Sequence, residues 1–140
     1  MKKPVNSICY CIMLRRAASA VTELYDKALK NEGISLNQYS IIINLNKLGM
    51  ATTTELADHI GLERSTLVRN LKPIIDMGYI QDISEEGERN NQLTVTSEGR
   101  YLLKKTIPIW ESVQEKITDI LSSENAGLLM EMLYKLQKTE

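Results

Sequence analysis

The chain has 140 residues, of which 43% are hydrophobic and 25% are charged, and its formal net charge is −1. These values describe one ordinary globular domain over residues 1–140 that is long enough to bury its own core. They exclude a strongly basic nucleic-acid binder, so any attraction for DNA must come from a local patch of charge. No run of about eighteen apolar residues occurs, and the sequence therefore predicts no membrane span.

The N-terminal segment does not read as a secretion signal, although it begins with positive charge. Its sequence is MKKPVNSICYCIMLRR, in which the apolar run is short and ends at Arg15 and Arg16 without a small-residue cleavage site. We therefore expect a cytoplasmic protein. One histidine and two cysteines are too few for a structural zinc site, and we expect neither a metal nor a cofactor. The sequence shows no nucleophile elbow and no phosphate-binding glycine loop, so we do not expect an enzyme.

Two helices are expected in the first fifty residues. Apolar residues at helical spacing predict a first helix ended by Gly33 and a second ended by Gly49. The first stripe comprises Ile8, Ile12, Val21, Tyr25, Ala28 and Leu29, and the second comprises Ile41, Ile42, Leu45 and Leu48. Cys9 and Cys11 lie two apart on the first expected helix, so their side chains point about 200° apart and cannot form a disulfide within it.

The segment from Thr52 predicts a helix-turn-helix. Thr52 and Glu55 have the spacing of a capping box, which starts a helix near Thr53, and Gly61 supplies the left-handed residue that ends it. A second helix follows from Arg64. Its apolar face is expected to hold Leu67, Leu71, Ile74 and Ile75, and its solvent face Ser65, Thr66, Arg69 and Lys72.

The solvent face of this second helix is suited to DNA. The guanidinium of Arg69 can donate two hydrogen bonds to a guanine edge, and we expect it to be the principal base reader. Short hydroxyl side chains and further cations can bind phosphates. The candidate contacts on this helix are Arg64, Ser65, Thr66, Arg69 and Lys72. The alternative is that these side chains form an ordinary solvated face.

A β-hairpin is expected over residues 79–95. Gly78 closes the preceding helix, and residues 79–83 and 92–95 alternate apolar and polar side chains as half-buried strands do. The intervening SEEGERNN is rich in turn formers, which predicts an exposed tip. Arg89, Asn90 and Asn91 lie near that tip, where they can contact the DNA backbone or the minor groove.

Two further helices are expected at the C-terminal end. Thr96 is a plausible N-cap for a long helix that Pro108 bends, and Ser123 is expected to cap the last helix. Together with the first helix they carry more apolar surface than the small central unit can cover, so dimerisation is expected to bury it. The expected interface residues are Ile8, Ile12, Ile117, Ile120, Leu129, Leu133 and Leu136. The alternative is that these helices fold back on their own subunit.

These features resemble the MarR family of winged helix-turn-helix transcription regulators over essentially the whole chain. Ser35 to Tyr39 resembles the family's second-helix start, and its helix-turn-helix is matched by ELADHIGLERSTLVRNLKPIIDMGYI. Its second wing strand and long fifth helix are matched by LTVTSEGRYLL. The resemblance implies a mainly α fold with a β-hairpin wing, a winged core over 35–96, and dimerisation helices over 5–32 and 97–138. It also implies a homodimeric regulator, acting as a repressor on a pseudo-palindromic operator in double-stranded DNA.

The resemblance further implies relief of DNA binding by a small ligand or by oxidation. Arg15, Tyr39 and Trp110 lie on helices that would line a cleft for an aromatic or phenolic ligand, although aromatic residues at such positions are more often part of a core. Cys11, with Arg15 four residues later, is the redox candidate, because nearby cations favour a thiolate. A buried, inert thiol is the alternative.

One departure from the family concerns the wing. The family's tip usually carries Asp-Arg-Arg, whereas Gly87, Glu88 and Arg89 stand here, preceded by Glu85 and Glu86. Only Arg89 matches a wing arginine, and the nearby carboxylates oppose a phosphate backbone. This acidic tip, with the near-zero net charge, favours one alternative function: a winged-helix module that binds protein rather than reading DNA.

Overall fold

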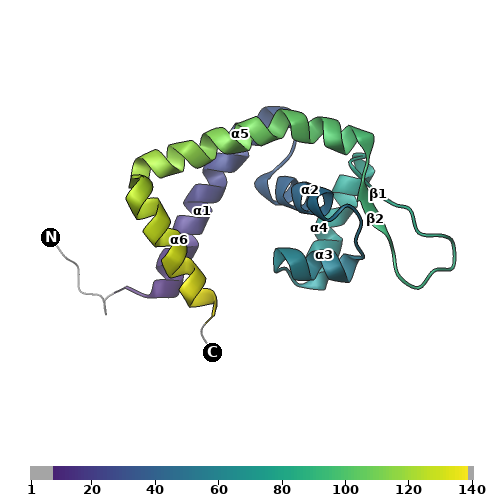
Figure 1. Cartoon of the computed structure of the whole chain (residues 1–140), viewed down its shortest axis with the longest axis horizontal. Coiled ribbons are helices and arrows are strands. Elements are labelled where there is room, and N and C mark those ends of the chain that lie inside the picture. The colour runs from purple at the N-terminus through teal and green to yellow at the C-terminus, as the bar shows by residue number, and fades with distance from the viewer. Residues whose placement is uncertain (1–7, 139–140) are drawn as a thin grey trace.

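The structure is a computed structural model that describes residues 8–138, so residues 5–7 of the expected first dimerisation helix lie outside the described part. The described chain is mainly α-helical with one antiparallel hairpin, as the sequence predicts (Figure 1). Its elements are α1 (Tyr10–Leu29), the 3₁₀ helix η2 (Lys30–Glu32), α2 (Leu36–Leu48), α3 (Thr53–Ile60), α4 (Arg64–Asp76), β1 (Ile80–Asp82), β2 (Leu93–Val95), α5 (Ser97–Leu121) and α6 (Ser123–Gln137). No helix among the described residues is long and apolar enough to cross a membrane.

The helices form two groups joined by α5. Figure 1 shows α2, α3, α4 and the hairpin at one end of the molecule, with α6 and the N-terminal half of α1 at the other. The winged core encloses the buried side chains, to which every described helix and strand except η2 and α6 contributes. Its largest fully buried members are Leu29, Ile41, Ile42, Leu45, Leu56, Leu67, Ile74, Ile80, Leu93 and Thr106. Each such aliphatic side chain contributes roughly 1.5–3 kcal/mol through burial.

Local capping signals place α3 and α5 as predicted. The Thr52 hydroxyl accepts from the Glu55 amide at 3.1 Å, and the Glu55 carboxylate accepts from the Thr52 amide at 2.8 Å. Gly61 ends α3 in the left-handed region with φ of 86°. Thr96 caps α5 by accepting from the Gly99 amide at 3.0 Å. The expected starts of α3 and α5 are thus confirmed.

The hairpin is shorter than the expected strands, with Ile80 paired to Val95 and Asp82 to Leu93. Tyr79 is excluded because its amide donates to the Ile74 carbonyl at the end of α4. A backbone bridge between Ala51 and Leu93 attaches β2 to the α2–α3 connection. The Asp82 carboxylate accepts from the Ser84 and Gln92 amides at 2.9 and 3.0 Å, and these hydrogen bonds lower its pKa. The base of the wing is therefore closed by a carboxylate.

Several local expectations are wrong. Cys9 is the extended N-cap residue of α1 rather than part of the helix, so the angular argument for the two cysteines does not apply. Ser122 caps α6, and Ser123 is its first residue. Ile75 and Leu48 are exposed, because Ile74 and Leu45 already occupy the core-facing positions of their helices.

The apolar stripe of α5 is divided between two environments. Gly99, Leu102, Leu103, Thr106 and Val113 are buried against the same subunit. The Tyr25 hydroxyl donates to the Gln114 side-chain oxygen and so ties α1 to α5. By contrast, α6 has no buried residue among those described. The fold-back alternative therefore holds for the first part of α5 but not for α6.

The start of α5 lies against the hairpin so closely that only glycine fits. A Cβ at Gly99 would stand 2.3 Å from the Tyr79 carbonyl oxygen and 2.6 Å from Val95 Cγ1. We therefore expect Gly99→Ala to destabilise the fold by about 1–3 kcal/mol through overpacking, measured by urea unfolding. The matched helical control is Gly127→Ala in α6, where nothing lies within 4 Å of the added Cβ. A Gly99→Ala protein as stable as the wild type would contradict this packing.

Candidate nucleic-acid interface

Helix α4 presents a row of exposed polar side chains on the face opposite its buried Leu67, Leu71 and Ile74. Arg64, Ser65, Arg69 and Lys72 are exposed, whereas Thr66 is half-buried. Among the described residues, none of the three cations on this helix is held in an ion pair. Their charges are therefore available to an external anion.

The tip of the wing is ordered by its own acidic residues. The Glu88 carboxylate accepts from the Glu85 amide at 2.8 Å, and the Glu88 amide donates to the Glu85 carbonyl at 3.1 Å. Gly87 completes this turn with φ of 89°. Arg89 and Asn90 follow and are both exposed. One of the three glutamates that oppose DNA is thus occupied in a local hydrogen bond.

A polar hollow of about 240 Å³ joins the wing to the helix-turn-helix. It brings Arg64, from the start of α4, together with Arg89 and Asn90 from the wing. Thr52, Thr53, Thr54, Asp82, Ser84, Glu88 and Asn91 complete its lining. Ser65, Thr66, Arg69 and Lys72 lie outside the hollow, farther along α4.

The structural roles of two residues of this region were missed by the sequence interpretation, which named Asn91 only as a candidate DNA contact at the wing tip. Asn91 hydrogen-bonds Thr53, and Asp82 closes the base of the wing. For Asp82 a signal existed, because Asp two residues before Ser is a common Asx-turn pattern. For Asn91 none existed, since its partner lies 38 residues away.

A cavity of about 450 Å³ lies between α2 and α5. Tyr39 and Trp110 line it, and their ring centroids are 6.2 Å apart with planes 23° apart. Burial and the nearby Glu111 raise the pKa of Tyr39 to about 12, so its phenol stays protonated at neutral pH. Arg15 is exposed on α1 and does not line this cavity within the subunit. The cation that does line it is Lys47, accompanied by Asn37 and Asn44.

Lys47 was also missed, although a signal was present. Asn37, Ser40, Asn44 and Lys47 follow one another at helical spacing and form a polar line along α2 beside Tyr39. Polar residues on one side of an otherwise apolar helix indicate a wet cavity or an exposed edge. In this structure the polar line on α2 borders the cavity and is also partly exposed to solvent.

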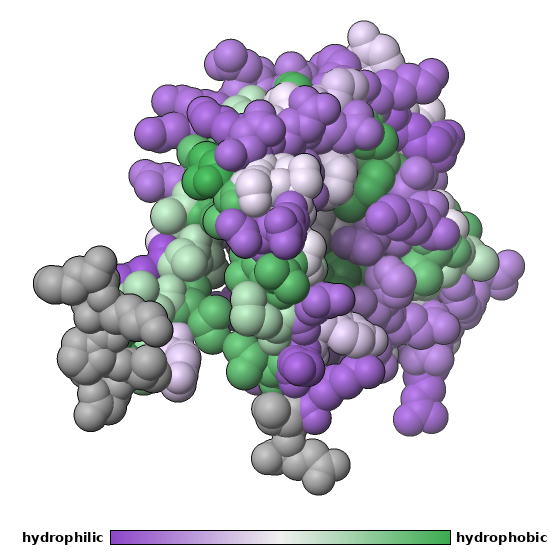
Figure 2. Space-filling view, turned by 60° about the vertical axis from the view of Figure 1, so that its left-hand side comes forward, coloured by the Kyte–Doolittle hydropathy of each residue, from purple (hydrophilic) through white to green (hydrophobic). Residues whose placement is uncertain are grey.

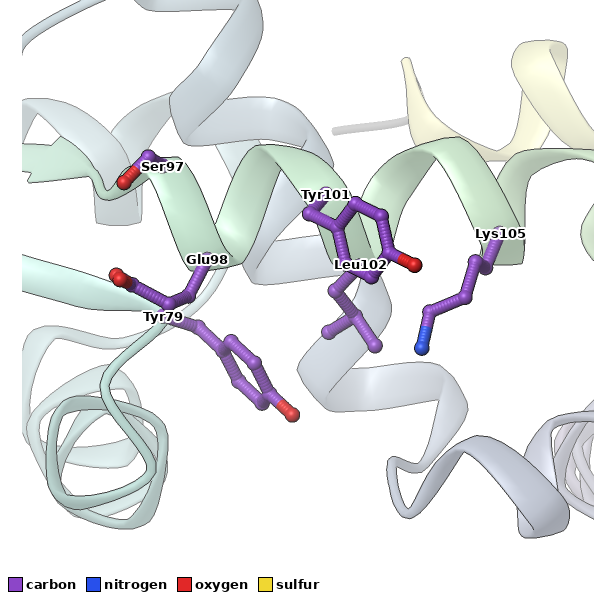
Figure 3. Close-up of a pocket in the computed structure, with 6 residues that line it drawn as sticks. All are labelled: Tyr79, Ser97, Glu98, Tyr101, Leu102 and Lys105. Atoms are coloured by element: carbon purple, nitrogen blue, oxygen red, sulfur yellow. The ribbon is translucent and has the colours of Figure 1, made fainter.

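A second cavity, of about 350 Å³, lies on the other side of α5 (Figure 3). Tyr79, Tyr101 and Leu102 form its apolar walls, and the ammonium of Lys105 points into the space beneath α5, 5.0 Å from the centroid of the Tyr101 ring. Lys105 is already paired with the Glu32 carboxylate at 3.1 Å. This cavity is therefore less suited to an anion than the one beside Lys47.

The N-terminal part of α1 and the whole of α6 expose large apolar side chains. Figure 2 shows hydrophobic residues gathered on this end of the molecule. Ile12 is 47% exposed, Ile120 69% and Leu136 52%, while Ile8, Ile117 and Leu133 are half-buried and Leu129 is 37% exposed. Met130 and six residues that were not predicted enlarge the same surface, namely Tyr10, Met13, Leu14, Leu128, Met132 and Tyr134. Both cysteines are free and exposed at its N-terminal edge.

Comparisons with known proteins agree with this geometry, although no family model matches the chain. The transcriptional regulator MosR of M. tuberculosis is 30% identical, with 93% of each chain covered and a TM-score of 0.77. A second structure shows MosR in complex with DNA. The transcriptional repressor CouR, bound to a 23-mer DNA duplex, is 21% identical, with 99% of each chain covered and a TM-score of 0.86.

A third similar structure contains a small molecule. NadR in complex with 4-hydroxyphenylacetate is 23% identical, with 100% of each chain covered and a TM-score of 0.73. At their levels of identity, CouR and NadR show that the fold is shared.

The hairpin beside α3 and α4 defines a winged helix-turn-helix DNA-binding protein. The chain belongs to the MarR family of winged helix-turn-helix transcriptional regulators. Members of this family are regulators rather than enzymes.

Proposed function

We propose that the protein is a homodimeric, cytoplasmic transcriptional repressor that reads a pseudo-palindromic operator and is released from it by a small phenolic or aromatic acid or by oxidation. The main observation in support of this proposal is the row of exposed cations on α4, next to the wing, that form no ion pair among the described residues. A protein-binding module has no need for such a row. The DNA complexes of MosR and CouR, and the name of the latter as a repressor, support the same function.

Within α4 we assign different tasks to Arg69 and Lys72. Arg69 stands in the middle of the exposed row, at the depth where a side chain reaches base edges, and Lys72 lies a turn nearer the C-terminal end. Ser65, Thr66 and Arg64 are then phosphate contacts at the start of the helix. Arg89 and Asn90 contact the backbone or the minor groove from the wing.

The proposed dimer forms through the apolar surface of α1, the C-terminal end of α5 and α6. Helix α6 buries none of its described residues within the subunit, and an apolar surface of this extent is the signature of an interface. Two-fold pairing would place the two α4 helices about one DNA turn apart.

The cavity between α2 and α5 is the proposed effector site. Tyr39 and Trp110 provide aromatic walls, and Lys47 provides a cation for a carboxylate. The phenolic acid in the NadR complex has this chemistry. In the proposed oxidative route, a hydroperoxide transfers one oxygen to the Cys11 thiolate to give a sulfenate, and the corresponding alcohol is released.

If Arg69 contacts a base and Lys72 contacts a phosphate, Arg69→Ala and Lys72→Ala should impair DNA binding in different ways. Arg69→Ala should lose about 1–3 kcal/mol on the operator and relax the preference at one base pair per half-site. Lys72→Ala should weaken all sequences alike and flatten the salt dependence by about one unit per subunit. Fluorescence anisotropy on operator and scrambled duplexes measures both effects. If Arg69→Ala binds with wild-type affinity and selectivity, α4 is not the recognition helix and the protein-binding module becomes the better explanation.

Dimerisation predicts that Ile120→Asp gives a folded monomer. Since Ile120 is 69% exposed in the subunit, a charge there costs little unless a partner buries it, where an unpaired charge costs several kcal/mol. Light scattering measures the mass and circular dichroism the fold. Ile83→Asp is the control, because this equally apolar side chain is 51% exposed on the wing. A wild-type monomer at micromolar concentration would refute the dimer.

The effector proposal is tested with Trp110, the one tryptophan of the chain. We expect 4-hydroxyphenylacetate to change its fluorescence and to release operator DNA, and Lys47→Ala to weaken both effects about tenfold by removing a charged partner of the carboxylate. The uncharged 4-methylphenol is the matched control ligand. Ligand binding without DNA release would exclude the cavity as the effector site.

The oxidation proposal is tested separately. Cumene hydroperoxide should release DNA from the wild type and from Cys9→Ser but not from Cys11→Ser.

A further inference from the structure

We propose that Asn91 is a positioning residue for DNA binding, because its side chain clamps the wing to the first turn of α3 and so fixes where Arg89 meets DNA. The inference rests on the proposed DNA-binding function. It assigns to Asn91 no contact with DNA of its own.

Both ends of the Asn91 amide are used on one partner. Its Oδ1 accepts from the Thr53 backbone amide at 2.9 Å, and its Nδ2 donates to the Thr53 hydroxyl. Thr53 is only 3% exposed, so this anchor is held firmly by the core. The first amides of a helix lack intrahelical partners, and Asn91 thereby satisfies one that Thr52 and Glu55 leave free.

The rest of the wing has no comparable attachment. Beyond Asp82 the paired strands end, and the hairpin continues through the Ile83 amide bonded to the Gln92 carbonyl. The remaining hydrogen bonds of the tip, at Ser84 and between Glu85 and Glu88, lie within the wing itself. Among the described residues 84–91, Asn91 alone hydrogen-bonds an element outside the wing.

This attachment determines the position of Arg89. Arg89 lies two residues before Asn91, and it lines the polar hollow together with Arg64. Two residues span about 7 Å of extended chain, so a fixed Asn91 confines Arg89 to the neighbourhood of α4. A wing free to move would lose conformational entropy when it binds DNA.

The acidic residues at the wing tip make the position of Arg89 more important for DNA binding. Glu85 and Glu86 are exposed and lie before the Gly87 turn, whereas Arg89 lies after it. A small rotation of the wing would exchange the cation for carboxylates at the phosphate backbone. The clamp therefore keeps Arg89, rather than Glu85 or Glu86, beside Arg64 in the polar hollow.

The test is a double-mutant cycle between Asn91→Ala and Arg89→Ala in the full chain. The probe is the duplex that the wild-type protein selects from a random-sequence pool, with dissociation constants measured at two salt concentrations. We expect each single change to weaken binding roughly fivefold to tenfold, and the double change to be no more than about twofold weaker than Arg89→Ala alone. Asn91→Ala should also flatten the salt dependence as Arg89→Ala does.

Thr52→Ala is the matched control. It removes another cap of α3, the hydroxyl that accepts from the Glu55 amide, without detaching the wing. If Asn91 only stabilises α3, Asn91→Ala and Thr52→Ala will have equal effects that both add to that of Arg89→Ala. Additive effects of Asn91→Ala, or unchanged DNA affinity, would overturn the proposal.

A measurement without DNA tests the Asn91 clamp separately from the proposed DNA-binding function. Hydrogen exchange of the wing amides over residues 84–92 should be faster in Asn91→Ala than in Thr52→Ala. If the wild type selects no duplex, the proposed function fails whatever exchange shows. Unchanged exchange in Asn91→Ala would overturn the clamp whether or not DNA binds.

Discussion

The close contact between Gly99 and the Tyr79 carbonyl is the constraint on which the rest of the structure depends. Around it, the Thr96 hydroxyl donates to the Gly78 carbonyl at 2.6 Å and Arg100 donates to the Val95 carbonyl at 2.9 Å. The last turn of α4, both strands and the first turn of α5 are thereby fixed to one another. Because α5 runs on to the opposite end of the molecule, its direction relative to the recognition helix is set here (Figure 1).

That junction explains how one chain holds two different kinds of surface. The first part of α5 buries its apolar residues on the winged core, whereas α6 leaves its own uncovered. The winged helix-turn-helix is therefore complete within one subunit, whereas the uncovered apolar surface lies at the far end of α5. In the proposed dimer, the spacing of the recognition helices then depends on the angle of α5. The cavity of Tyr39 and Trp110 lies between α5 and α2, where a ligand would act on that angle.

Sequence patterns predicted what depends on neighbours along the chain. Thr52 with Glu55, Gly61 and Thr96 each act within a few residues, and each lies where the pattern indicates. The predictions failed where two adjacent apolar residues compete for one core position, as at Ile74 and Ile75, and where a cap is shared between helices, as at Ser122. The hydrogen bonds of Asn91 could not be predicted, because its partner Thr53 becomes a neighbour only after folding. The exposed polar row on α4 was predictable, but the grouping of Arg64 with Arg89 in one hollow was not.

The charges of α4 and the wing are also arranged by contacts between residues that are close in the sequence. A net charge of −1 gives little general attraction for DNA, so affinity must come from the few cations of α4 and the wing. Asp82 and Glu88 are occupied by backbone amides and hold the wing in shape, which gives these carboxylates a structural use beside a phosphate-binding surface. Weak nonspecific binding raises the ratio of specific to nonspecific affinity. In the proposed function, DNA binding would depend on the positions of α4 and Arg89 rather than on total charge, and small changes in those positions would then suffice to release the DNA.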